Sequence, residues 1–135
     1  MKIINVVVGI IKEKDKYLLT KRAHPDKRFH GKWQFPGGEL ENNESLTDCL
    51  HRELKEETNL KIINEEFIGK VFESFRDNCH FIFFTYRCRL KNKVNKIILD
   101  KETSDYNWFT LEEAKKLNSL DFTFEMLKIS VGDRS

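Results

Sequence analysis

The sequence predicts an α/β fold in which a mixed sheet lies between helices. Two observations support this prediction. Apolar segments of strand character alternate along the chain with segments of helical periodicity. The first strand segment, Ile3–Ile11, is also apolar almost throughout, which is typical of a strand covered on both faces. A single domain spanning residues 1–135 is expected, because 135 residues are too few for two independent cores.

The N-terminal part of the chain consists of strand and loop segments. A polar turn at Glu13–Lys16 and a basic, irregular loop at Pro25–Lys32 interrupt it, and Pro36-Gly37-Gly38 is expected to stop regular structure. The segments of strand character are Ile3–Ile11 and Tyr17–Lys21, followed by the short apolar segment Trp33–Phe35.

The principal helix is expected over about Glu44–Thr58. Asn42 or Asn43 supplies its N-cap, Glu44 lies in its first turn, where the helix dipole favours an acid, and Asn59 closes it. The later strands are expected at Phe67–Phe75, Cys79–Leu90 and Asp105–Thr110, and the later helices at Leu111–Leu117 and Phe122–Ile129.

Composition and charge exclude several classes of protein. Hydrophobic residues make up 39% of the chain, so a core can form and a disordered chain is not expected. With 24 Lys and Arg against 22 Asp and Glu, there is no general reason to bind nucleic acid or an anionic membrane. The run Ile3–Ile11 is too short to span a bilayer. Cys49, Cys79 and Cys88 are an odd set without metal-binding spacing, which is typical of buried structural thiols, and no small-residue cleavage site follows the N-terminal apolar stretch, so a reducing cytoplasm is expected.

The acids of the principal helix are arranged unusually. Glu53, Glu56 and Glu57 share one face, at i, i+3 and i+4. That face overlaps, instead of opposing, the apolar stripe that the helix turns inward, which consists of Leu46, Leu50 and Leu54. Carboxylates held together repel one another and are costly to desolvate, so cations are expected to resolve the conflict.

Two explanations fit this acidic face. It is either a solvated acidic patch or a site for Mg²⁺ or Mn²⁺, which prefer clustered carboxylate oxygens, and the three acids alone favour neither. Neighbouring residues favour the metal. Arg52 adjoins Glu53 and can hold carboxylates with its guanidinium, while Gly37 and Gly38 let bare backbone approach a ligand or ion. Because bare acids repel phosphate, this pattern indicates a multi-metal site for a phosphorylated substrate.

The motif around this helix resembles the Nudix box. Gly38, five residues, Glu44, seven residues and then the segment Arg52–Leu60 follow the pattern G-x5-E-x7-R-E-U-x-E-E-x-G-U, where U is a bulky aliphatic residue. Every defined position agrees except Asn59, which stands where the family usually has Gly. Asn is the commonest substitute for Gly at a left-handed helix exit, so this departure is structural. So many fixed positions over 23 residues make the resemblance specific.

The resemblance extends over most of the chain. Val7–Ile11, Leu19–Arg22 and Trp33–Gly38 are similar to the MutT-like branch of Nudix proteins. Glu102 is similar to the family's late acidic residue, and the segment Trp108–Glu113 to its W-x4-E-L type segment. The resemblance implies a Nudix-type α/β/α sandwich around a mixed sheet, and hydrolysis of a nucleoside diphosphate linked to another moiety.

The resemblance also implies roles for individual residues. Arg52 would orient the acids, and Glu44 would buttress Arg52 or reach metal through water. The general base would be Glu53 or Glu102, since the family uses more than one arrangement. The implied ligands of Mg²⁺, or of Mn²⁺, are the backbone carbonyl of Gly37 and the carboxylates of Glu53, Glu56 and Glu57.

The substrate implied by the MutT-like branch is a nucleoside triphosphate, cleaved to a nucleoside monophosphate and pyrophosphate. A chain with no additional domain for a second sugar or a lipid tail favours it. ADP-ribose or another nucleoside diphosphate sugar is the alternative within the family. The alternative outside it is a non-catalytic nucleotide-binding module, for which a broken acid set would be expected. The partner is therefore a small nucleotide, and the protein is expected to be a monomer or a homodimer.

Residues outside the helix are candidates for binding the substrate. Arg22 matches a phosphate-contacting position, and Gly38 lies where the backbone can approach a ligand. Asp121 precedes the last helix, near the place where MutT-like proteins have a base-reading side chain. It is also a candidate N-cap, and N-cap preferences favour that role. Aromatic candidates for stacking on the base, for which core positions are favoured, are Trp33, Phe35, Phe75, Phe81 and Phe83.

Overall fold

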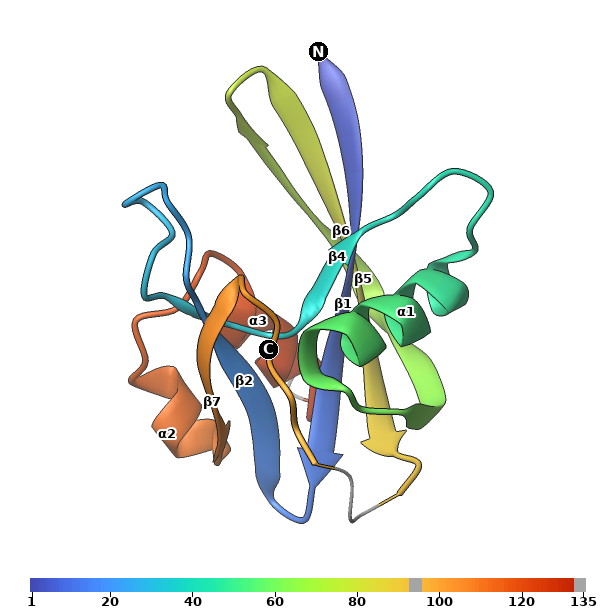
Figure 1. Cartoon of the computed structure of the whole chain (residues 1–135), viewed down its shortest axis with the longest axis vertical. Coiled ribbons are helices and arrows are strands. Elements are labelled where there is room, and N and C mark those ends of the chain that lie inside the picture. The colour runs from blue at the N-terminus through green and yellow to red at the C-terminus, as the bar shows by residue number, and fades with distance from the viewer. Residues whose placement is uncertain (93–95, 133–135) are drawn as a thin grey trace.

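A mixed sheet with helices on both faces forms the fold in the computed structural model, which describes residues 1–92 and 96–132 (Figure 1). The strands in the described residues are β1 (Lys2–Glu13), β2 (Lys16–Arg22), β3 (Trp33–Gln34), β4 (Gly37–Glu39), β5 (Ile62–Arg76), β6 (Cys79–Leu90) and β7 (Thr103–Phe109). The helices there are α1 (Leu46–Thr58), α2 (Leu111–Lys115) and α3 (Thr123–Ser130). None of these helices is long and apolar enough to cross a membrane.

The long first strand, β1, joins the parts of the sheet. It pairs in parallel with β6 and antiparallel with β2 and β4, while β5 pairs antiparallel with β6 and β7 with β2. The main strand order is β3-β2-β1-β6-β5. The sheet is therefore mixed, as the sequence predicts.

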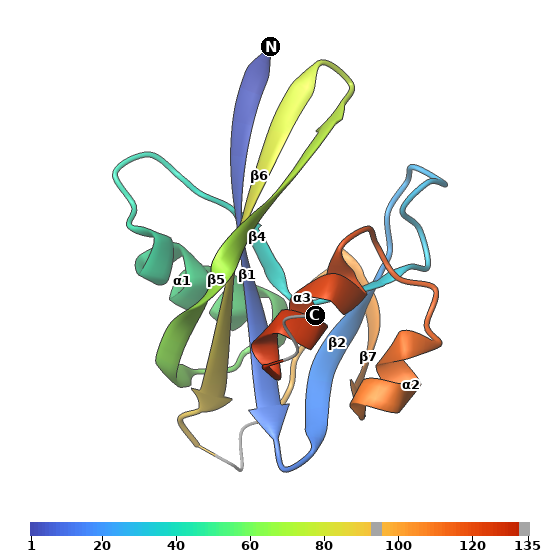
Figure 2. The same ribbon diagram turned by 180° about the vertical axis from the view of Figure 1, so that it is seen from behind.

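Alternate residues of β1 enter two separate cores. Val7 and Ile11 pack in the core beneath α1, whereas Val8 and Ile10 pack in the core that contains residues of α2 and α3. Figure 1 shows α1 in front of the sheet, and Figure 2, seen from behind, shows α3 on the opposite face. Because successive side chains of a strand point to opposite faces, a strand buried on both faces must be apolar throughout. The predicted α/β/α sandwich is confirmed.

Gly9 lets α1 approach the sheet closely. A Cβ atom at Gly9 would lie 3.0 Å from the side chains of both Leu50 and Leu54, the two fully buried leucines of α1. A Cβ atom there would force these two side chains to shift, so glycine at this position permits the close packing of α1 on β1.

Three local predictions are wrong. Pro36-Gly37-Gly38 does not stop regular structure, because Gly37 and Gly38 pair with Val8 and Val7 in the ladder between β4 and β1. The strand expected at Phe67–Phe75 begins earlier, at Ile62, since two register irregularities hide its alternation. Asp121 does not cap the last helix: Phe122 is its N-cap residue, with φ of 72°, and makes no side-chain cap hydrogen bond.

Candidate active site

Helix α1, which carries the acids, begins at Leu46, two residues later than the expected start at Glu44. Ser45 is the N-cap, and its hydroxyl accepts a hydrogen bond from the backbone N–H of Asp48 at 3.1 Å. The prediction of Asn42 or Asn43 as N-cap is wrong, and Glu44 lies before the helix instead of in its first turn. At the other end Asn59 adopts the left-handed conformation, with φ of 64°, as expected. Glu44 is therefore on a loop, from which its carboxylate reaches back over α1.

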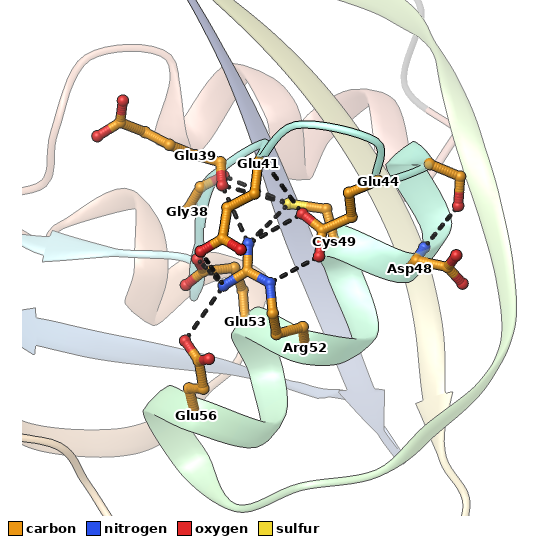
Figure 3. Close-up of polar contacts among 10 residues, drawn as sticks. Gly38, Glu39, Glu41, Glu44, Asp48, Cys49, Arg52, Glu53 and Glu56 are labelled. Carbon is orange, nitrogen blue, oxygen red and sulfur yellow. Dashed lines mark hydrogen bonds and ion pairs between the residues drawn. The ribbon is translucent and has the colours of Figure 1, made fainter.

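Arg52 is the centre of the acidic site (Figure 3). Its guanidinium donates two hydrogen bonds to Glu44, at 2.6 and 3.0 Å, and one to Glu53 at 2.8 Å. Further hydrogen bonds reach Glu56 at 3.2 Å and the backbone carbonyl of Glu39 at 3.1 Å. This forked geometry fixes the plane of the guanidinium and thereby the positions of the carboxylates around it.

Glu44 was expected to contact Arg52 or to reach metal through water, and the structure shows its contact with Arg52. The hydrogen bonds from Arg52 hold the pKa of Glu44 down at about 2. Those same bonds raise the pKa of Arg52. Both groups are charged at any physiological pH, so the pair is a permanent brace beside the other acids.

Glu57 is the deepest acid of the site. It is 7% exposed, and its Oε2 accepts a hydrogen bond from the backbone N–H of Gly37 at 2.7 Å. Burial, reinforced by the negative charges of Glu53, Asp100 and Glu102, raises its pKa to about 8. Gly37 cannot be replaced here, because a Cβ atom would overlap the backbone of Val7 and Val8. β4 thus places a bare backbone segment directly against the buried carboxylate.

Glu53 lies between Arg52 and the second glycine of β4. Its side chain is 15% exposed, and burial raises its pKa despite the hydrogen bond from Arg52. A Cβ atom at Gly38 would overlap the Glu53 carboxylate. The requirement for glycine at this position therefore comes from the close approach of Glu53, a reason that spacing in the sequence does not show.

Glu56 does not share the inward position of its neighbours. Its side chain is 58% exposed and reaches sideways to Arg52. Within residues 1–92 and 96–132, no three His, Cys, Asp or Glu side chains are gathered closely enough to hold a metal ion. The expectation of three acids on one inward face holds for Glu53 and Glu57 and is wrong for Glu56.

Residues from distant parts of the chain face the acids of α1. Arg22, at the end of β2, donates a hydrogen bond to Gln34 at 3.3 Å, and the charges of Glu57 and Glu102 act on it. Glu102 is exposed, on the turn before β7. Sequence reasoning missed Asp100, which acts on Glu57 more strongly than Glu102 does. The position of Asp100, two residues before Glu102, was the signal in the sequence that could have identified it.

The candidates for contacting the base are dispersed. Asp121 is exposed on the rim of a cavity of about 560 Å³, together with Phe72 and Phe122. Phe35 is 4% exposed in the core, as favoured by the sequence, and Phe83 packs against that core. Phe75 is 62% exposed, so it is not a core residue. The structure brings Arg22, Glu53 and Glu102 within electrostatic range of Glu57, and Asp121 is not among the groups that act on Glu57.

Comparison with known proteins identifies relatives over nearly the whole chain. The NUDIX domain family matches residues 1–128. The chain is 38% identical over 118 residues to the 8-oxo-dGTP diphosphatase of Buchnera aphidicola, which covers 87% of this chain and 85% of the relative. It is 27% identical over 118 residues to the nucleoside triphosphatase NudI of Escherichia coli, covering 80% and 82%. The solved MutT protein of Methanosarcina mazei has a similar fold, with a TM-score of 0.82 at 24% identity over 99% of this chain and 97% of that one.

Proposed function

Because this chain belongs to the NUDIX domain family and is a hydrolase of the MutT-like type, we propose that it cleaves nucleoside triphosphates to monophosphates and pyrophosphate. We propose Mg²⁺ as the cofactor, with Mn²⁺ as a substitute. Two relatives that each match at least 80% of this chain support the substrate class, since one is named a diphosphatase of 8-oxo-dGTP and the other a nucleoside triphosphatase. Three free cysteines, two of them buried, fit the cytoplasmic location that forms part of the proposal.

The observation that carries the proposal is the environment of Glu57. A carboxylate that is 7% exposed normally has a cationic partner, yet the charges that raise its pKa are those of Glu53, Asp100 and Glu102. Arg52 hydrogen-bonds Glu44, Glu53 and Glu56 instead. Glu57 forms no ion pair within residues 1–92 and 96–132, and a buried carboxylate of this kind fits a hard divalent ion.

Four groups are the proposed ligands of the ion, and Glu56 would have to leave Arg52 to join the other three. They are the carboxylates of Glu53, Glu56 and Glu57 and the backbone carbonyl of Gly37. When bound, Mg²⁺ neutralises the oxygens of the diphosphate and makes water a better nucleophile. The chain itself does the positioning: Arg52, braced by Glu44, fixes the orientation of Glu53, and the N–H of Gly37 fixes that of Glu57.

Two acids remain candidates for the general base. Glu53 is favoured by its raised pKa, because a more basic carboxylate accepts a proton from water more readily. Glu102 is favoured by its exposure on the turn opposite α1, where water can reach it. The pH profile of kcat separates them: Glu102→Gln should remove the acidic limb if Glu102 is the base, and should leave that limb in place if Glu53 is.

A substrate screen with Mg²⁺ and identification of both products tests the function. Nucleoside triphosphates should yield a monophosphate and pyrophosphate. Release of ribose phosphate from ADP-ribose, with triphosphates left intact, would establish the diphosphate-sugar alternative. Binding of nucleotides without turnover of any would establish a non-catalytic module. Glu57→Gln serves as the inactive control, because it preserves the acceptor for the Gly37 N–H but removes the charge.

A further inference from the structure

A short stretch of the chain passes the carboxyl end of α1 before it enters β7. It consists of residues 96–102, here named the crossing segment, and Figure 1 shows it beside the last turn of α1. The crossing segment carries Asp100 and Glu102, whose charges act on the buried Glu57. The position of this segment relative to α1 therefore decides how the two acids face the site.

Two hydrogen bonds tie the crossing segment to α1. The backbone N–H of Ile98 donates to the carbonyl of Thr58 at 3.0 Å. The side-chain amide of Asn59 donates to the carbonyl of Lys96 at 3.2 Å. Between these two bonds, the side chain of Ile97 packs against the core beneath α1. The first bond joins backbone to backbone, so only the second depends on the identity of a side chain.

Asn59 is itself held in the orientation that this bond needs. Its backbone adopts the left-handed conformation, with φ of 64°, and its N–H donates to the carbonyl of Lys55 at 2.9 Å. Its Oδ1 accepts a second hydrogen bond from the ammonium of Lys55, at 2.8 Å. Glycine, which the family usually has at this position, would supply the left-handed conformation but no side-chain donor. Asn59 therefore joins the helix exit to the crossing segment, which a glycine could not do.

The other end of the crossing segment is fixed by a compact turn beside β2. The Oδ1 of Asp100 accepts hydrogen bonds from the backbone N–H of Glu102 at 3.1 Å and from the hydroxyl of Thr103 at 3.0 Å. The carbonyl of Glu102 accepts a hydrogen bond from the backbone N–H of Ala23 at 2.9 Å. Glu102 thus lies between an anchor beside β2 and an anchor on α1. Loosening the anchor on α1 would change the position of Glu102 relative to the acids of that helix.

We propose that Asn59 is a positioning residue, which anchors the crossing segment and thereby holds Glu102 facing the carboxylates of α1. The inference rests on the proposed function, in which Glu102 is a candidate general base. Proton transfer from water requires a base at hydrogen-bond distance, so a small displacement of its carboxylate lowers the rate steeply. The residue at which this chain departs from the family motif gives it a link to the turn that carries Glu102.

Two substitutions of Asn59 and one matched control test this link. Asn59→Gly removes both side-chain bonds. Asn59→Asp keeps an acceptor for Lys55 but replaces the donor by an oxygen, which repels the carbonyl of Lys96. The control is Asn64→Gly, because Asn64 is exposed and also left-handed, with φ of 58°. Within residues 1–92 and 96–132 its side chain makes no hydrogen bond.

Amide hydrogen exchange measures the anchor without reference to activity. A hydrogen bond of ordinary net strength corresponds to about a fivefold change in a local opening equilibrium, so the N–H of Ile98 should exchange about fivefold faster in both Asn59 variants. For nucleoside triphosphates with Mg²⁺, kcat should fall at least about threefold in both, with a smaller change in KM. Asn64→Gly should change neither exchange at Ile98 nor kcat.

A double substitution shows whether Asn59 acts through Glu102. In the Glu102→Gln background, Asn59→Gly should lower kcat no further, because the carboxylate to be positioned is gone. An equal loss in both backgrounds would show that Asn59 supports the fold at large, and would overturn the inference.

The remaining outcomes separate this inference from the proposed function. If the wild-type protein hydrolyses triphosphates but exchange at Ile98 or kcat is unchanged in both Asn59 variants, the inference is wrong and the function stands. The same holds if Glu102→Gln is as active as the wild type. If the wild-type protein hydrolyses no triphosphate, the proposed function fails, and with it the role of Asn59 in catalysis. Exchange at Ile98 still decides whether Asn59 anchors the crossing segment.

Discussion

Replacement of Glu57 by Gln should stabilise the protein in the absence of divalent metal. Burial raises the pKa of Glu57 from its ordinary 4.5 to about 8, so the fold favours the protonated form. The stability contributed by this group is greatest below pH 4.5 and is lost as pH rises toward 8. The carboxyl ionises freely in the unfolded chain but not in the fold. This difference lowers the free energy of unfolding by about 3 kcal/mol at pH 7 and by less than about 1 kcal/mol at pH 5. Gln avoids this cost and still accepts the hydrogen bond from Gly37.

Thermal unfolding in EDTA across pH 5 to pH 8 measures this effect. For a chain of this size, about 3 kcal/mol corresponds to a rise in melting temperature on the order of 10 °C at pH 7. The rise should shrink to a few degrees at pH 5. Glu56→Gln is the matched control, because it removes the same charge from a side chain that is 58% exposed. It should change the melting temperature by no more than about 2 °C at either pH.

Addition of Mg²⁺ should reverse the order of stabilities. The wild-type protein gains stability from binding the ion, whereas Glu57→Gln should gain much less. Turnover should be lost in both Glu56→Gln and Glu57→Gln, since both acids are proposed ligands. A stabilisation of Glu57→Gln that is equal at pH 5 and pH 8, or a destabilisation at pH 7, would show that Glu57 is not a buried, unfavourably charged carboxylate.

Three other substitutions test single contacts. Arg52→Lys keeps the charge but loses the two bonds to Glu44, so kcat should fall at least about tenfold; unchanged kcat would mean that Arg52 only neutralises charge. Asn59→Gly should destabilise by about 1 kcal/mol, because the side-chain bond to the Lys96 carbonyl outweighs relief at the left-handed position, and a higher melting temperature would contradict this. Asp121→Asn has no helix cap to disturb, so the melting temperature should stay within about 2 °C while kcat/KM ratios across four nucleoside triphosphates change. Constant ratios would exclude a base contact.

The acidic helix could be predicted because its information is local. Glu53 and Glu57 are one helical turn apart, and the helix advances by a fixed angle per residue, so spacing alone places them together. Asn59 as the helix exit and β1 as a strand buried on both faces follow from similarly local rules. The same rules place Glu56 on their face, and its outward position was decided by the competing bond to Arg52.

Features that join distant segments could not be predicted from spacing. Gly38 requires glycine because β4, paired with β1, passes directly against Glu53 of α1. Asp100 acts on Glu57 only because the turn before β7 returns to the carboxyl half of α1. Asp121 appeared to be a cap because capping propensity is a local average, whereas the chain enters α3 through a left-handed Phe122.

The sequence by itself determined the two-sided sheet, the acidic helix and its bracing arginine, since each is encoded by residues within a few turns or strand positions of one another. Tertiary structure alone decided which acid is buried, how far its pKa rises, and that Phe29 of one loop meets Arg76 of a distant hairpin. Burial and the electric field at a residue are sums over all neighbours in space. They become defined only when the strands have paired and the helices have packed on the sheet.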